Sequence, residues 1–332
     1  MREITITAND AGRRLDRFLR KYLPGASLGE IYRIIRRDVR IGDKRRSESY
    51  ILSEGDTLRL YLPDSTLAVL GAPDPSESGR GFPRKRSSAA KRTFGIVHED
   101  DDILVVNKPY GLLTHGDARE KKDHLANQVK DYLTAKGDFD PREKVFTPAP
   151  ANRLDRNTTG LVLFGKTAAA MRELNRMIRD GEVRKFYLTI ACGEIDEDLH
   201  LSGGLIKDEA ANKVTVTASG QGDRPPGQKE IETVVRPLEV LRFGDGLTAT
   251  LCEVELLTGR THQIRAHLAS AGHPLIGDSK YADRSARKIN RYVRERFGLT
   301  TQLLHACRTE FAGNVYEAPA PKRFNEILGK LK

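Results

Sequence analysis

One break in the apolar patterning constrains the fold of this chain more than any other feature. Residues 64–92 read "DSTLAVLGAPDPSESGRGFPRKRSSAAKR", where Pro, Gly, Ser and basic residues replace any apolar repeat, and this composition is typical of a solvated linker. The chain has 332 residues, more than a single core usually organises. We therefore predict a small unit at residues 1–63, a flexible basic linker at 64–92 and a larger unit at 93–332.

The small unit contains two amphipathic patterns. Apolar residues recur at i, i+3, i+4 and i+7 in two successive stretches, which predicts two short helices. These positions are Leu15, Phe18, Leu19 and Tyr22, followed by Leu28, Ile31, Tyr32 and Ile35. Ser27 followed by Glu30 is the pattern of a capping box at the start of the second helix. Residues 50–63 then have strand-like composition around a turn at Gly55 and Asp56.

The second predicted helix has a basic face opposite its apolar one. Residues 11–63 hold thirteen Lys or Arg against seven Asp or Glu, a net charge of +6, and the whole chain carries +10. A basic helical face is often only solvated, but so one-sided a cluster in a small unit favours contacts with phosphate. The predicted contact residues are Arg33, Arg36, Arg37, Arg40, Lys44 and Arg45. The excess of basic over acidic residues indicates a polyanionic partner, with nucleic acid favoured over an anionic membrane.

The larger unit shows more strand patterns than helix patterns. Hairpins are predicted at residues 93–111 and 233–258, strands at 158–167 and 184–192, and helices between Thr167 and Gly181 and at 260–272. Because many of the strands look hairpin-linked, we expect an α+β fold in which helices pack against a mostly antiparallel sheet.

Several classes of protein and site are disfavoured. No apolar run approaches the roughly 18 residues of a membrane-spanning helix, and "MREITITAND" lacks the apolar stretch of a secretory signal, so we expect a cytoplasmic protein with no membrane partner. Cys192, Cys252 and Cys307 are far apart and never form a CxxC pair, which predicts reduced core residues. No phosphate-binding glycine loop occurs, and His262 and His267 are off metal-ligand spacing, so no nucleotide cofactor or metal is expected.

The stretch "NRLDRNTTG", residues 152–160, places Asp155 between Arg153 and Arg156. Taken alone, it indicates either a surface ion pair, which stabilises little, or a carboxylate kept ionised for chemistry. Three further fragments accompany it in the chain. They are "NKPYG" at 107–111, "TGRTHQIR" at 258–265 and "GHPLIGD" at 272–278.

With these four fragments in this order, the chain resembles RluA-type pseudouridine synthases. The nearest branch joins an αL-motif RNA-binding domain, first recognised in a small-subunit ribosomal protein, to a catalytic domain that modifies large-subunit ribosomal RNA. The resemblance covers nearly all of the chain outside the linker and residues 116–146. It implies the pseudouridine synthase fold and a monomeric isomerase that acts without a cofactor on specific uridines of structured RNA, most simply 23S ribosomal RNA.

The resemblance also assigns roles to individual residues. The signature acid falls on Asp155, the active-site tyrosine on Tyr187 in "KFYL", and the arginine that pairs with the acid on Arg265. Arg153 corresponds to a basic residue near the flipped nucleotide. The usual histidine three residues before the acid is Asn152 here, so the role of that position stays open.

The reaction explains these residue types. Pseudouridine formation breaks the N1–C1′ bond of uridine, rotates the base and rejoins it through C5, so an ionised carboxylate is needed beside the ribose. It either attacks C1′ or removes a ribose proton, and both routes stay open. Burial raises the pKa of an aspartate, and the partner Arg265 opposes that shift. Tyr187 can stack on the base or accept or relay the C5 proton, and the uridine must first be extruded from the RNA.

Three alternatives remain. The substrate can be transfer RNA, or the chain can be a non-catalytic RNA-binding factor of ribosome assembly; glycosidase chemistry would need a second positioned carboxylate.

If residues 152–156 are extended, Arg153 and Asp155 project to one side and Arg156 to the other. Lys108 is interpreted equally well as a phosphate contact and as part of a structural turn.

Overall fold

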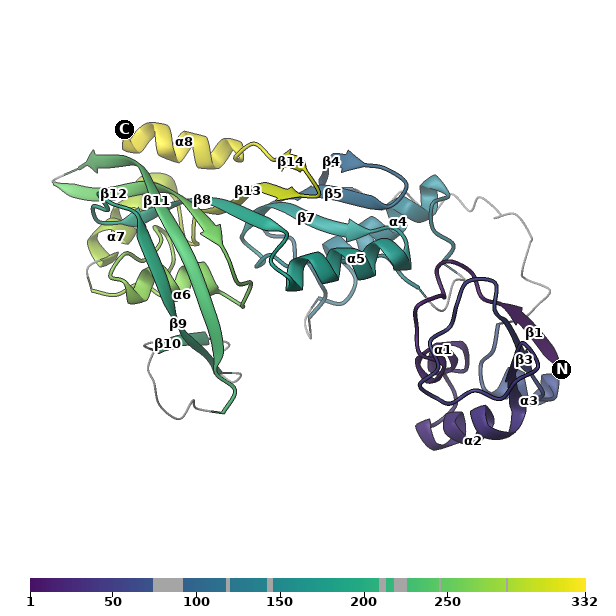
Figure 1. Ribbon diagram of the computed structural model, residues 1–332. Helices are drawn as coiled ribbons and strands as arrows, with labels where there is room; N and C mark the ends of the chain where they lie inside the picture. The colour runs from purple at the N-terminus through teal and green to yellow at the C-terminus, as the bar shows by residue number, and fades with distance from the viewer. Residues whose placement is uncertain are drawn as a thin grey trace.

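The computed structural model shows an elongated molecule with the N-terminal unit at one end and the C-terminal helix at the other (Figure 1). Within the predicted linker, residues 74–91 lie outside the described part of the chain. The structure describes residues 1–73, 92–117, 120–141, 146–208, 213–217, 226–244, 246–284 and 286–332.

The N-terminal unit packs two helices on a three-stranded antiparallel sheet. The strands β1 (Arg2–Thr5), β2 (Val39–Ile41) and β3 (Thr57–Leu60) lie in the order β1-β3-β2, and the helices are α1 (Leu15–Tyr22) and α2 (Leu28–Asp38). The Ser27 side chain accepts from the Glu30 N–H, and the Glu30 carboxylate accepts from the Ser27 N–H. The capping box and both predicted helices are therefore confirmed.

Two boundaries in this unit differ from the prediction. Residues 64–70 are not linker, because helix α3 (Asp64–Val69) inserts the fully buried Leu67 into the same core. The N–H of Gly25 donates to the carbonyl of Leu70 at 3.0 Å, which ties the end of α3 to the unit. Arg40 is not on the basic helix, because α2 ends at Asp38 and Arg40 lies on β2.

The larger unit is built on a single sheet of eleven strands. The main path runs β10-β9-β11-β12-β8-β13-β7-β5-β4, with β14 on β13 and β6 on β7. Every described pair is antiparallel except β13 with β7, so the predicted mostly antiparallel α+β fold is confirmed. The strands are β4 (Gly95–Glu99), β5 (Ile103–Lys108), β6 (Ala149–Pro150), β7 (Thr159–Gly165), β8 (Arg184–Cys192), β9 (Leu199–Asp208), β10 (Lys213–Thr217), β11 (Lys229–Phe243), β12 (Leu247–Leu256), β13 (Leu304–Phe311) and β14 (Asn314–Glu317).

Helices cover both faces of this sheet. They are α4 (Leu125–Lys136), α5 (Ala168–Arg179), α6 (Gln263–Ser270), α7 (Ala286–Phe297) and α8 (Lys322–Leu331). Alternate residues of β8 face opposite sides: Tyr187 joins the core with α4 and α6, whereas Ile190 joins the core with α7 and α8. Both predicted hairpins are present, β4–β5 and β11–β12, and Thr167 caps α5 by accepting from the Ala170 N–H.

A direct hydrogen bond connects the two units. The Asn9 side-chain oxygen accepts from the N–H of Ala168, the first residue of α5, at 3.1 Å.

Of the cysteines, Cys192 and Cys252 are buried and Cys307 is half-buried, and burial raises the pKa of the first two thiols to about 12. None of the described helices has the length and apolar composition of a membrane span.

Candidate active site

The backbone around Asp155 is fixed on both sides of this residue. The Thr114 hydroxyl donates to the Leu154 carbonyl at 2.8 Å and accepts from the Leu154 N–H at 3.1 Å. On the other side, the Lys108 ammonium donates to the Arg156 carbonyl at 3.0 Å. The buried Leu154 side chain anchors the loop in the core between α4 and α6. Asp155 is therefore presented by a loop whose position does not depend on its own carboxylate.

Asn152 fastens the start of the same loop to β7. Its amide nitrogen donates to the Leu161 carbonyl at 3.3 Å, and its amide oxygen accepts from the Leu163 N–H at 2.8 Å. This pair of bonds needs a donor and an acceptor on one side chain, which an amide provides. Position 152, whose role the sequence left open, has a structural function in this chain.

Lys108 is a structural residue rather than a phosphate contact. Its side chain is fully buried, and its ammonium donates to the carbonyls of Pro109, Leu112 and Arg156. Burial lowers the pKa of Lys108 to about 7, with the negative charge of Asp155 opposing the shift. Three carbonyl acceptors match the three N–H donors of the charged ammonium. These hydrogen bonds favour the charged form and so also oppose the lowering of the pKa. The phosphate-contact alternative is therefore wrong.

The structure brings Asp155 and Arg265 together. Arg265 lies on α6 and donates from Nη1 to Asp155 Oδ2 at 3.0 Å. Its Nε and Nη2 donate to the two carboxylate oxygens of Asp278 at 2.7 and 3.0 Å, a bidentate pair. Burial lowers the pKa of Arg265, but the hydrogen bonds and charges of Asp278 and Asp155 outweigh it and raise the pKa above its usual value. The guanidinium is held charged and in one orientation.

Asp278 is a site residue that the sequence analysis missed. Its side chain is 1% exposed, compared with 26% for Asp155, and its carboxylate accepts from Arg265 and from the N–H groups of Lys280 and Tyr281. Gly277 before it has a φ of +76°, and a Cβ there would lie 2.3 Å from the Thr301 carbonyl, so only glycine fits. The fragment "GHPLIGD" was noted for its resemblance, but nothing local in it indicates which residue Asp278 pairs with.

His262 completes the surroundings of the carboxylate. It adopts the left-handed conformation before α6, with φ +55°, and its Nε2 lies 3.7 Å from Asp155 Oδ2. Its Nδ1 is 2.8 Å from the Tyr281 hydroxyl, which accepts from the Val214 N–H. Burial lowers the pKa of His262, although Asp155 opposes the shift, so the ring is neutral at pH 7.

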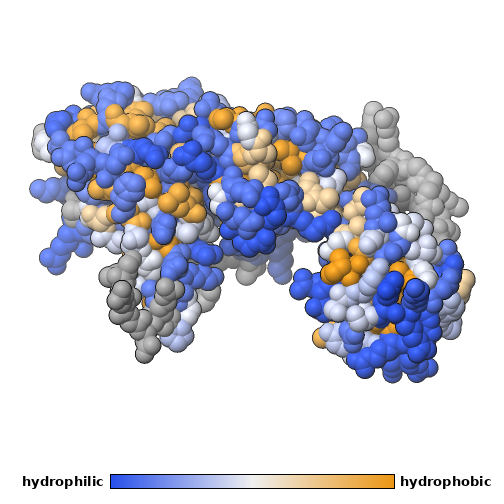
Figure 2. Space-filling model, in the orientation of Figure 1, coloured by the Kyte–Doolittle hydropathy of each residue, from blue (hydrophilic) through white to orange (hydrophobic). Residues whose placement is uncertain are grey.

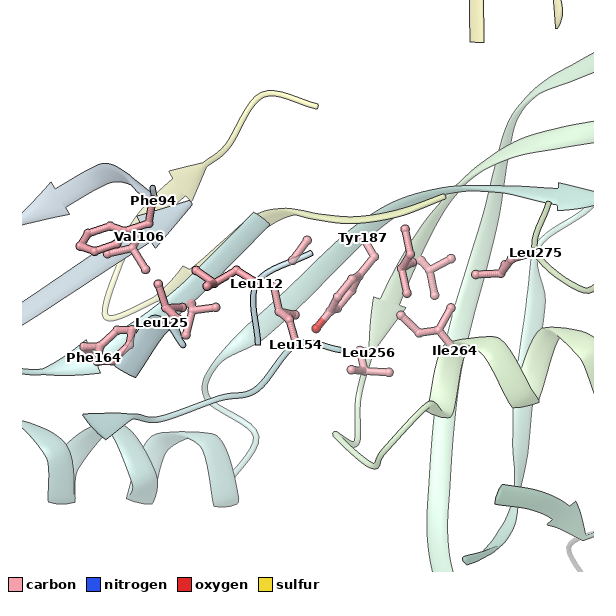
Figure 3. Packing of buried hydrophobic residues seen from close by; sticks show 14 of the residues in the cluster. Phe94, Val106, Leu112, Leu125, Leu154, Phe164, Tyr187, Leu256, Ile264 and Leu275 are labelled. Carbon is pink, nitrogen blue, oxygen red and sulfur yellow. The ribbon is translucent and has the colours of Figure 1, made fainter. Parts of the chain in front are cut away.

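Tyr187 lies in the core beside this loop. Only 5% of the residue is exposed, and its hydroxyl end is directed toward Leu154 (Figure 3). Burial and then the charge of Asp155 raise the pKa of Tyr187 above its usual value. The phenol therefore stays protonated at neutral pH and does not act as a phenolate base.

The basic residues of the prediction fall in two places. Arg153 is exposed next to Asp155, and its charge, after burial, contributes to the lowered pKa of His115. Arg156 is also exposed and lies 3.7 Å from Asp117. The N-terminal set lies on α2, β2 and the turn that follows, far from the Asp155 loop (Figure 1). Its members are Arg33, Arg36, Arg37, Arg40, Lys44 and Arg45, all exposed except the half-buried Arg40.

The family model for RNA pseudouridylate synthase matches residues 102–270. This span includes the Asp155 loop, Tyr187 and Arg265. The chain belongs to the RNA pseudouridine synthase family. The enzyme is therefore an isomerase, as the sequence predicts, and RNA is the substrate of this synthase.

Curated relatives match almost the whole length of this synthase. The ribosomal large subunit pseudouridine synthase C of Vibrio cholerae is 32% identical over 338 residues, which covers 99% of this chain and 96% of the relative. The protein of the same name from Escherichia coli has the same identity and coverage. The similarity therefore extends through the N-terminal unit.

Solved structures show the same fold for the synthase. The human RNA pseudouridylate synthase domain containing 4 matches with a TM-score of 0.57 and 23% identity, covering 71% of this chain and 92% of that chain. Human RNA pseudouridylate synthase domain containing 1 matches with a TM-score of 0.50 and 23% identity, covering 69% and 83%.

Proposed function

We propose that this synthase converts specific uridines of large-subunit (23S) ribosomal RNA into pseudouridine, with Asp155 as the catalytic carboxylate. The observation that carries the chemistry is the buried Asp278–Arg265 pair that holds Asp155 Oδ2. The substrate is supported by the full-length similarity to two synthases that are named for the large ribosomal subunit.

The two carboxylate oxygens of Asp155 have different surroundings. Oδ2 faces Arg265 and His262, whereas Oδ1 makes no hydrogen bond to any residue within the described ranges. Oδ1 is thus the oxygen that meets the ribose, either by attacking C1′ or by removing a ribose proton. In both routes Arg265 fixes the position of Oδ2, and the negative charge on that oxygen is balanced by the guanidinium.

Tyr187 contributes as a neutral phenol. Its ring lies in the core beside the loop with 5% of the residue exposed, so it borders the place of the flipped uracil and does not offer a full stacking face. Its raised pKa keeps the hydroxyl protonated. The hydroxyl can therefore take up the proton that leaves C5 only if it donates its present proton to another group at the same time. The relay alternative is favoured over the acceptor alternative for this reason.

The RNA outside the flipped nucleotide is bound by basic surfaces. Arg153 borders the Asp155 loop, and the N-terminal basic residues contact phosphates farther along the RNA, with no sequence reading of their own. The working unit in this proposal is a monomer. A substrate in ribosomal RNA supports a cytoplasmic location.

The proposal is tested by Asp155→Asn. Asparagine keeps the size of the side chain but removes the nucleophilic charge, so release of tritium from ribosomal RNA transcripts that carry 5-tritiated uridine should fall by at least about 100-fold. RNA binding should stay within about threefold, because phosphate contacts are unchanged.

A matched control is Asp101→Asn, which changes an exposed aspartate in the turn between β4 and β5 and should keep full activity. Undiminished release by Asp155→Asn would refute the catalytic assignment. Release from transfer RNA transcripts but not from ribosomal ones would redirect the substrate.

A further inference from the structure

Helix α7 carries a row of exposed cations that the proposed site does not use. Its apolar side, with Ile289 and Val293, is buried against the sheet, together with Ile190 and Leu251. The cations fall on the opposite side at i, i+1, i+4 and i+7 and are all exposed. We call them the α7 stripe: Arg287, Lys288, Arg291 and Arg294.

The α7 stripe is not neutralised. Within the described part of the chain, none of its four side chains forms an ion pair. Some other exposed arginines of the larger unit do: Arg176 on α5 pairs with three carboxylates, and Arg184 on β8 pairs with Glu255 and Glu310. Like charges at i, i+4 destabilise a helix by roughly 0.2–0.5 kcal/mol per pair. A stripe that keeps this repulsion without internal partners matches a polyanion outside the chain.

One hydrogen bond links α7 to the segment that carries Asp278. The side-chain oxygen of Asn290 on α7 accepts from the N–H of Gly277 at 2.8 Å, and Gly277 directly precedes Asp278, which holds Arg265. Helix α7 lies at the end of the molecule opposite the N-terminal unit, with β8 between them (Figure 1). Figure 2 shows hydrophilic residues interspersed with hydrophobic patches over this end.

We propose that the α7 stripe is a second phosphate-binding surface for the substrate RNA, distinct from the N-terminal basic residues. This inference rests on the proposed function, in which the flipped uridine belongs to a large folded RNA. Surfaces at both ends of an elongated molecule require an RNA that extends to both sides of the Asp155 site. RNA fits this stripe better than an acidic protein does, because the substrate of this synthase is itself RNA and each cation can contact a phosphate independently of sequence.

The test replaces three cations of the stripe in the full-length protein. Arg287, Arg291 and Arg294 are changed together to Gln, which keeps the helix propensity. If these side chains contact phosphates, the slope of log K against log salt for a ribosomal RNA fragment should fall by about 2–3. Affinity at moderate salt should fall by roughly 10-fold or more, while the turnover rate at saturating RNA stays unchanged because the Asp155 site is intact.

The matched control removes the same charge from cations that already have partners. Arg242, Lys322 and Lys332 pair with Glu194, Glu326 and Glu239, and changing these three to Gln should alter the slope by less than about 1. Combining the α7 change with Arg33→Gln, Arg36→Gln and Arg37→Gln should add the two slope losses, because the surfaces are distant.

Equal slopes for the wild type and the α7 variant would overturn the inference, and would leave an acidic protein as the partner to seek. The inference would also be overturned if the control variant lost as much of the salt slope as the α7 variant does. A melting temperature at or above that of the wild type verifies that the α7 variant folds. The tritium assay with Asp155→Asn tests the proposed function separately. That variant leaves the α7 stripe unchanged, and the α7 variant leaves Asp155 unchanged.

Discussion

At the residue scale, one guanidinium determines how Asp155 behaves. Arg265 directs two of its donor groups to the buried Asp278 and one to the accessible Asp155. The buried acid fixes the arginine, and the arginine then fixes one oxygen of the working acid. This division of roles follows from exposure, since Asp278 has no access to substrate and Asp155 has.

We expect Asp278→Asn to lower turnover by roughly 10- to 100-fold, the usual effect of losing a residue that orients a catalytic group. The amide retains one acceptor, so Arg265 loses its bidentate partner and its orientation. The substrate KM and RNA affinity should change little, because Asp278 does not reach the surface. Single-turnover rates and melting curves of the same preparations provide the measurement.

A purely structural role for Asp278 would change this outcome. In that case the melting temperature would fall, but the single-turnover rate of the folded fraction would equal that of the wild type. Breaking a buried ion pair costs about 3–5 kcal/mol, so the assay is run well below the melting temperature of the variant.

At the element scale, the loop at residues 152–158 is held by segments that are distant in sequence. Lys108, the last residue of β5, and Thr114, which follows that strand, hold the backbone of the loop through hydrogen bonds. Asn152 connects the start of the loop to β7. The loop is rigid because its backbone groups are paired with side chains on neighbouring elements. No repeating secondary structure is needed to hold it.

Thr114→Val tests this arrangement. Valine has nearly the same shape but leaves the N–H and carbonyl of Leu154 unpaired in a buried position, which costs about 1–3 kcal/mol. Urea denaturation should show this loss, and turnover should fall because Asp155 is less well positioned.

Thr134→Val is the comparison for Thr114→Val. The Thr134 hydroxyl donates to the Lys130 carbonyl inside α4, so its removal should change stability by less than about 0.5 kcal/mol. If both variants lose the same stability and neither loses activity, the loop is not positioned by Thr114.

At the scale of the whole molecule, a network of ion pairs lies at the β4–β5 edge of the large sheet. Lys166 lies 3.1 Å from Glu99 and 2.6 Å from Asp138, and Lys136 lies 2.8 Å from Glu99. Burial raises the pKa of Glu99, but hydrogen bonds from Lys136, Tyr132 and Lys166 outweigh burial and lower the pKa below its usual value.

This network makes stability dependent on pH. The folded-state pKa of Glu99 is below the unfolded value near 4.5, so its contribution is present above about pH 4.5 and is lost as pH falls through the folded pKa. Glu99→Gln should therefore be less stable than the wild type at pH 7, by about 1–3 kcal/mol. The two proteins should converge below roughly pH 4. Melting temperatures between pH 7 and 3.5 test this, and a constant difference at every pH would contradict it.

The sequence by itself determined the local elements. The capping box of Ser27 and Glu30, the Thr167 cap and the β4–β5 and β11–β12 hairpins were all predicted correctly. The interactions that form them lie within a few residues of the chain, so composition and spacing carry the information. The sequence fragments also identified the family and brought Asp155 and Arg265 to attention as a pair.

Only the tertiary structure decided what surrounds that pair. Asp278 lies 123 positions after Asp155, and Lys108 meets the carbonyl of Arg156 across 48 positions. Leu67 shows the same limit, because a short apolar run beside a Pro- and Ser-rich stretch becomes core only where the N-terminal sheet leaves space for it. Buried charges and short apolar runs acquire their roles from partners that the fold supplies, and local patterns do not encode the distance to those partners.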